Sequence, residues 1–133
     1  MNINKFTQSS MAAVQNLEKI AADYGNQEIE QEHLLYTLLT QEDSLILKLI
    51  EKMEINKEYF LNTVKNALDA KVKVSGGELR FGQYLNKALV NAEDEAKAMG
   101  DEYVSVEHLF LALLKYPSPS MKKIWSEFGI TRE

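Results

Sequence analysis

The chain has 133 residues, of which 45% are hydrophobic and 26% are charged, so it is long enough to bury one well-packed core. It carries a formal net charge of -5, which argues against a nucleic-acid partner, and it contains no cysteine, which excludes disulfides and thiolate sites. No apolar run approaches the roughly 20 residues that a membrane span needs. We therefore expect a cytoplasmic protein with a protein or small-molecule partner, and no membrane association.

The sequence is one unit written twice. Shifting the chain by 75 residues aligns residues 6–58 with residues 81–133 without a gap and gives 15 identities in 53 pairs. We predict a single domain over residues 1–133, with a first repeat at 6–70, a flexible connection at 71–80 and a second repeat at 81–133. Two units of this size would each be marginally stable alone, so the repeats should share a core.

Each repeat opens with an amphipathic helix, predicted near residues 7–24 and 82–99. Met11, Val14 and Leu17 recur at helical spacing, and the second repeat follows a similar pattern. Thr7 is placed to cap the first helix. Gly25 and Gly100 stand where a left-handed residue would end each helix.

A short extended stretch and a more apolar helix follow each glycine, and these two helices should form the shared core. A third helix is expected over residues 44–53, and its counterpart starts after Ser118-Pro119, a favoured cap and first turn. A fourth helix, over residues 57–70, occurs in the first repeat alone. The predicted fold is therefore all-α: a pseudo-twofold bundle of two four-helix repeats, the second truncated, with about seven helices.

The two repeats differ in length at their ends. Glu133 aligns with Glu58, where the fourth helix of the first repeat begins. Either the natural protein ends short or the sequence is a fragment of a longer protein, and we expect the fragment. The connection contains Ser75-Gly76-Gly77, a composition typical of a flexible linker without a function of its own.

Glutamate-histidine pairs at 32–33 and 107–108 are the first candidates for a site. Residues adjacent on a helix point about 100° apart, so a glutamate and its neighbouring histidine do not converge on one ion, and the His-Glu-x-x-His pattern is absent. We therefore expect no metal and a structural role for His33 and His108. Because the chain also lacks a phosphate-binding loop, a nucleophile elbow and cysteine, we expect no catalytic residues and no enzyme.

Glu32 and Glu107 fall in the first turn of the two buried helices. One interpretation is a favourable interaction with the helix dipole, worth roughly 0.3 to 1 kcal/mol. The other is a pair of symmetry-related carboxylates at the seam between the repeats, where they could accept a cationic or hydrogen-bonding group. The sequence leaves both open.

The pattern Gly-x-x-x-(Ile/Val)-x-x-Glu-His-Leu, present in both repeats and preceded by Lys5-Phe6-Thr7, closely resembles the amino-terminal domain of the Clp ATPases. The likeness covers essentially the whole chain. Residues 26–34 look most like the version in the ClpB disaggregases, with Gln31 in place of the usual proline. The Gly-Thr pair that tends to precede Glu-His in the ClpC unfoldases is absent from both repeats.

The resemblance implies a full domain of about eight helices that captures unfolded or aggregated polypeptide for a disaggregase. In such domains the substrate lies in an apolar groove between the repeats, and the matching positions here are Thr7, Leu89, Asp101, Glu107 and His108. In the family a leucine can occupy the position of His108, so this chain has a polar side chain where an apolar contact to substrate is implied.

The alternative that the resemblance implies is a ClpC-like docking domain for adaptor proteins or phosphoarginine-marked substrates, with Glu32 and Glu107 as the binding residues. In either case the resemblance implies no cofactor in this domain and ATP in the parent chain. The parent would be a homohexamer, and the isolated domain would be a monomer.

Overall fold

The computed structural model describes residues 3–74 and 76–130, which form an all-α fold with two very short strands. In chain order the elements are η1 (Ile3–Lys5), α1 (Gln8–Gln15), α2 (Leu17–Asp23), β1 (Glu28–Ile29), α3 (Gln31–Thr40), α4 (Leu45–Lys52), α5 (Lys57–Asp69), β2 (Arg80–Phe81), α6 (Gln83–Ala98), α7 (Val106–Lys115) and α8 (Pro119–Phe128). The predicted fold class is confirmed.

One predicted helix is divided. The helix expected over residues 7–24 is interrupted at Asn16, which separates α1 from α2, whereas its counterpart α6 is continuous. The backbone N–H of Asn16 contacts the carbonyls of both Ala12 (3.1 Å) and Ala13 (3.2 Å), which tightens the turn. Asn16 itself keeps right-handed helical dihedrals, so the interruption is slight.

The predicted helix ends are observed. The hydroxyl of Thr7 accepts from the backbone N–H of Ser10, and the hydroxyl of Ser118 accepts from that of Met121, with proline in the first turn of α8. Gly25 and Gly100 follow α2 and α6 with φ of 71° and 75°. This left-handed conformation suits glycine and turns the chain toward the next element.

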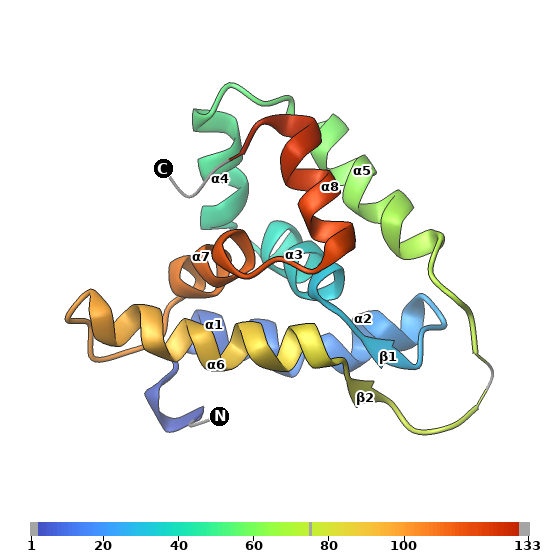
Figure 1. Ribbon diagram of the computed structural model, residues 1–133, viewed down its shortest axis with the longest axis horizontal. Helices are drawn as coiled ribbons and strands as arrows, with labels where there is room; N and C mark the ends of the chain where they lie inside the picture. The colour runs from blue at the N-terminus through green and yellow to red at the C-terminus, as the bar shows by residue number, and fades with distance from the viewer. Residues whose placement is uncertain (1–2, 75, 131–133) are drawn as a thin grey trace.

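Helices α3 and α7 lie at the centre of the bundle, where they pack against each other (Figure 1). Helices α1, α2 and α6 cover one side of this pair, and α4, α5 and α8 cover the other. The central helices are buried on several faces, as their apolar sequences predict: Leu34, Leu38, Leu109 and Leu113 are all inaccessible to solvent. The core is therefore shared between the repeats.

The extended segments of the two repeats pair reciprocally. Strand β1 of the first repeat pairs in parallel with β2, so that Ile29 lies opposite Phe81. In the same way Phe6 pairs in parallel with Val104. Because Phe6 aligns with Phe81 and Ile29 with Val104, each repeat contributes its opening residue to the extended stretch of the other, which is the pairing that a twofold relation requires.

Gln31 joins the repeats on one side of the seam. Its buried side-chain amide donates to the carbonyls of Tyr84 (3.0 Å) and Tyr116 (2.9 Å), and its Oε1 accepts from the N–H of Ser118 (2.9 Å). The residue that departs from the usual proline thus ties the start of α3 to the start of α6 and to the α7–α8 loop.

The connection between the repeats is partly fixed to the first repeat. Residues 71–74 make hydrogen bonds and an ion pair to residues 24–32, and Arg80 and Phe81 form β2. Ser75 and Glu133, on which the predictions of a flexible linker and of a truncated second repeat partly depend, lie outside the described residues. Within the described ranges, no helix combines the length and apolar character that crossing a bilayer requires.

Candidate binding site at the seam between the repeats

The seam site consists of the turn at residues 99–105, the first turn of α7, and the start of the chain that pairs with it. Thr7 belongs to this site because its N–H donates to the carbonyl of Val104 (3.0 Å). Its hydroxyl accepts from the N–H of Ser10 (3.2 Å) while its side chain remains partly exposed. Thr7 can therefore contact a ligand while it caps α1.

The two histidines have the same structural role in both repeats. The N–H of Glu30 donates to Nδ1 of His33 (2.8 Å), and the N–H of Ser105 donates to Nδ1 of His108 (2.9 Å), so each ring closes a capping box at the start of its helix. With Nδ1 accepting, the proton of the neutral ring is on Nε2. The structural role predicted for the histidines is confirmed.

The second ring nitrogen of each histidine contacts the residue that follows Gly25 or Gly100. Nε2 of His33 lies 2.9 Å from Oδ1 of Asn26, and Nε2 of His108 lies 2.8 Å from Oδ2 of Asp101. Burial, assisted by the positive charge of Lys71, lowers the pKa of His33 from 6.5 to about 4. His33 is therefore a neutral ring that orients Asn26, as His108 orients Asp101.

The two glutamates lie in different surroundings. The side chain of Glu32 is 1% exposed, its Oε1 lies 3.4 Å from Nζ of Lys71, and its Oε2 accepts from the hydroxyl of Ser120. Glu107 is exposed on the first turn of α7. Only Glu107 presents a carboxylate that an external ligand can reach without rearrangement of the side chains around it.

Leu89 and His108 are buried, although the resemblance implies that both contact substrate. Leu89 is 1% exposed and lies in the core stripe of α6 with Leu85, Ala88 and Ala92. His108 is 4% exposed beneath Asp101. Neither side chain lines an open surface in this structure, so their role in substrate contact stays a prediction that requires α6 or the turn to move.

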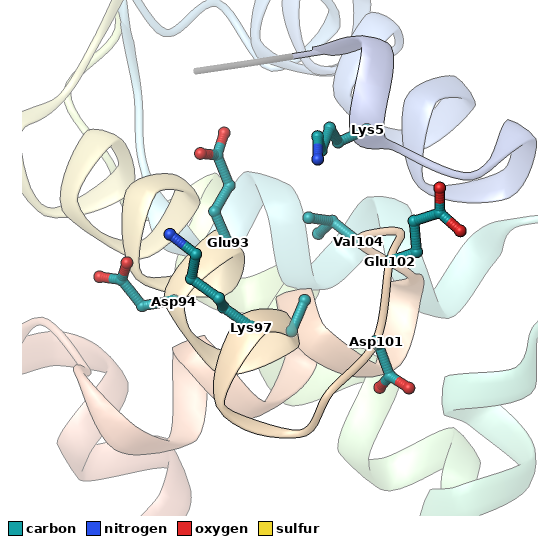
Figure 2. A pocket seen from close by; sticks show the side chains of 8 residues that line it. Lys5, Glu93, Asp94, Lys97, Asp101, Glu102 and Val104 are labelled. Carbon is teal, nitrogen blue, oxygen red and sulfur yellow. The ribbon is translucent and has the colours of Figure 1, made fainter.

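A cavity of about 290 Å³ lies beside the turn, between η1 and the last turns of α6. Its lining is largely charged and consists of Lys5, Glu93, Asp94, Ala96, Lys97, Asp101, Glu102 and Val104. Figure 2 shows Lys5 facing the space between Glu93 and Glu102, whereas the carboxylate of Asp101 points away from Lys5. Asp101 thus belongs to the opposite face of the turn, toward His108.

Exposed apolar side chains flank Asp101 on the same turn. Met99 is 55% exposed and Tyr103 is 51% exposed. Met99 follows the last helical residue of α6, Ala98, as the helix ends, so its side chain lies outside the core. The seam site therefore combines exposed apolar and acidic groups.

Among residues 3–74 and 76–130, no three histidine, aspartate or glutamate side chains are arranged to hold a metal ion. The histidines instead contact Asn26 and Asp101 and cap the helix starts, and Glu32 pairs with Lys71. What the seam site can do chemically is bind, through a polar rim and exposed apolar side chains.

These features define a helical domain made of two repeats whose extended segments pair with each other. The chain belongs to the family described as the Clp repeat (R) N-terminal domain, whose sequence pattern matches residues 5–128. The Clp amino-terminal domain is a non-catalytic domain of an ATPase family, which confirms the prediction that this chain is not an enzyme.

Several curated proteins are similar over the chain. The chaperone protein ClpB of Nitratidesulfovibrio vulgaris is 38% identical over the whole chain, and that of Clostridium tetani is 36% identical over the whole chain. The ClpB of Porphyromonas gingivalis is 40% identical over 86% of the chain. The chain spans 16%, 16% and 13% of these three proteins, respectively.

Solved structures share the fold. The Hsp104 N-terminal domain from Candida albicans has a TM-score of 0.84 at 23% identity and covers 96% of this chain and 84% of that one. The N-terminal domain of the ClpV1 ATPase from E. coli has a TM-score of 0.81 at 20% identity, with 98% and 80% covered. A ClpV N-domain in complex with a VipB peptide has a TM-score of 0.75 at 20% identity, with 98% and 81% covered.

Proposed function

We propose that this chain is the client-binding amino-terminal domain of a ClpB-type disaggregase and that it captures unfolded or aggregated polypeptide at the seam site. The observation that carries the proposal is the pair of exposed apolar side chains, Met99 and Tyr103, on either side of Asp101. Whole-chain similarity to ClpB chaperones supports the kind of client. The peptide bound by a ClpV N-domain supports peptide binding on this fold.

The physical basis is the burial of apolar side chains that an unfolded client exposes. Each square ångström of apolar surface removed from water contributes roughly 25 cal/mol, without any reading of client sequence. Two exposed side chains give weak binding for one domain. In a homohexameric parent, six tethered copies would raise the overall affinity through effective concentration. In this proposal ATP binds to the parent outside this chain, in the cytoplasm, and the isolated domain is a monomer.

The test is the binding of a permanently unfolded model protein to the chain and to the double variant Met99→Ser, Tyr103→Ser. Both side chains are more than half exposed, so the variant should fold normally, and its affinity should fall about tenfold. A matched control removes two exposed apolar side chains from the outer face of α6, Tyr84→Ser and Val90→Ser. Equal affinity of the two double variants would refute the proposed location.

The alternative of phosphoarginine docking at Glu32 and Glu107 has less support. It needs both carboxylates, and Glu32 is buried against Lys71 and Ser120. Titration with free phosphoarginine, followed by NMR at the seam site, separates the alternatives. Saturable shifts at both glutamates without binding of the unfolded protein would favour docking, and the opposite result would favour client capture.

A further inference from the structure

The connection between the repeats lies on the first repeat as an extended segment over residues 71–74, which we call the strap. It leaves the end of α5 and passes the end of α2 on its way to β2 (Figure 1). The N–H of Val74 donates to the carbonyl of Gly25 (2.9 Å), and the side-chain amide of Asn26 donates to the carbonyl of Val72 (3.1 Å). The backbone of the strap is thus fixed at two points.

The side chains of the strap alternate in the reverse of the usual pattern for a surface strand. The ammonium groups of Lys71 and Lys73 contact the first repeat, whereas Val72 is 80% exposed and Val74 is 41% exposed. Successive side chains of an extended chain point to opposite sides, so the lysines share one side and the valines the other. The strap is therefore held by charged groups and backbone contacts rather than by burial of its apolar side chains.

Lys73 caps two helices at once. Its Nζ lies 2.6 Å from the carbonyl oxygen of Tyr24, which follows the last residue of α2, and 3.3 Å from that of Leu68 in the last turn of α5. It also lies 5.5 Å from the centre of the Tyr24 ring. Carbonyls at a helix C-terminus carry partial negative charge, so a cation is favourable there. Lys73 is nevertheless an exposed residue, which a reagent in solution can reach.

Lys71 is the buried member of the pair. Its Nζ lies 3.0 Å from Oε2 of Glu30 and 3.4 Å from Oε1 of Glu32, and its side chain is 14% exposed. Within the described residues, Oε1 of the buried Glu32 receives no hydrogen bond, so Lys71 is the cation that balances it. Because one residue separates the two lysines on an extended chain, lifting the strap at Lys73 also draws Lys71 away from the carboxylates.

We propose that the strap is a clasp controlled by modification of its lysines: acylation of Lys73 lifts the strap from the first repeat and exposes Lys71 and the carboxylate of Glu32. Acylation removes the positive charge that the two helix ends attract. An ammonium group has three donors, whereas the amide that replaces it has one N–H for the two carbonyls. The inference goes beyond client capture, because it concerns the connection and not the seam site.

The modification requires an activated acyl donor, such as an acyl phosphate. The uncharged amine of Lys73 attacks the carbonyl carbon of the donor, a C–N bond forms as the C–O bond to phosphate breaks, and the amine proton passes to solvent. Once the strap is lifted, the same reaction can reach Lys71. The two modifications should therefore be cooperative, while the helices keep their internal hydrogen bonds.

The experiment treats the whole folded chain with acetyl phosphate and follows the peptide of residues 70–78, which a protease that cleaves after acidic residues releases. Mass spectrometry counts the chains that carry no, one or two acetyl groups on this peptide. We expect Lys71 to react about tenfold faster in chains already acetylated at Lys73. A doubly modified fraction equal to the product of the two single fractions would overturn the proposal. So would a reaction of Lys71 in the unmodified chain as fast as that of the exposed Lys65.

Variants separate the role of charge from that of the side chain. Lys73→Gln should raise the acetylation rate of Lys71 about tenfold and lower the protection of the Val74 N–H against hydrogen exchange by a similar factor. Lys73→Arg keeps the charge and the donors, so both values should stay near those of the parent, as should those of the control Lys65→Gln on the exposed side of α5. Equal rates in all three variants would overturn the proposal. A rise in Lys73→Gln that is accompanied by loss of helical circular dichroism would overturn it as well, because unfolding would then explain the exposure.

Discussion

Replacing Gln31 with proline should destabilise the domain, although proline suits the backbone at this position. Gln31 is the first residue of α3, and Glu30 before it is extended, with φ of -117° and ψ of 176°. The substitution removes three hydrogen bonds, and the buried N–H of Ser118 loses its partner at a cost of about 1–3 kcal/mol. The lower conformational entropy of the unfolded chain with proline offsets about 0.4–1 kcal/mol of this cost, which leaves a loss of about 1.3 kcal/mol.

Thermal unfolding followed by circular dichroism measures this loss. With an unfolding entropy of about 2.1 cal/mol/K per residue, the melting temperature should fall by about 5 °C. The control is Gln8→Pro, which places proline at the first, exposed residue of α1 after the extended Thr7 and removes no side-chain bond across the seam. A melting temperature of Gln31→Pro within about 2 °C of the parent or above it, with the control unchanged, would refute the stabilising role of the amide.

Three further predictions concern the first repeat and its counterparts. The pKa of His33 is about 4 in the folded chain and 6.5 as its reference value, so the folded state favours the neutral ring. The free energy of unfolding should therefore stay constant above pH 6.5 and fall by about 3 kcal/mol as the pH drops toward 4. An NMR titration midpoint of His33 near 6.5 would contradict this prediction. In urea unfolding, Asn26→Asp should cost about 2 kcal/mol, because the donor to a backbone carbonyl becomes a buried carboxylate, whereas Asp101→Asn should change stability by less than about 0.5 kcal/mol. Lys71→Ala should cost about 2 kcal/mol by leaving a buried glutamate without its cation, and the exposed-pair control Lys48→Ala less than about 0.5 kcal/mol; equal losses would show that burial of the pair is unimportant.

Local signals predicted most of the fold. Helical spacing, the caps at Thr7 and Ser118, and the glycines at 25 and 100 each depend on residues a few positions apart, and all were observed where predicted. The interruption at Asn16 was missed, because its repeat partner Asn91 lies inside the continuous helix α6. Both positions hold asparagine, so the type of the residue at the interruption does not distinguish them.

The site was harder to predict because it depends on where distant segments run. The partnership of Lys71 with Glu32 joins a linker to a helix 39 positions earlier, and no periodicity signals it. Leu89 shows a conflict between two sources. Its spacing with Leu85 and Ala92 indicated the core, whereas the resemblance pointed to a groove, and its burial follows the spacing. The sequence identifies Gln31 as a departure from the proline that is usual in the family. Its three hydrogen-bond partners lie in α6 and the α7–α8 loop, and only folding brings them near Gln31.

The reciprocal pairing of Phe6 with Val104 and of Ile29 with Phe81 has a consequence for how the domain holds together. A single repeat would leave both its opening residue and its extended stretch unpaired, and only a second copy could satisfy them. Such an assembly would be a dimer whose stability depends on concentration. Joining the copies through residues 71–80 makes the same association intramolecular, so the domain behaves as a dimer fused into one chain. Cleavage between Gly76 and Gly77 should therefore yield two fragments that remain associated, each closing the other's edge.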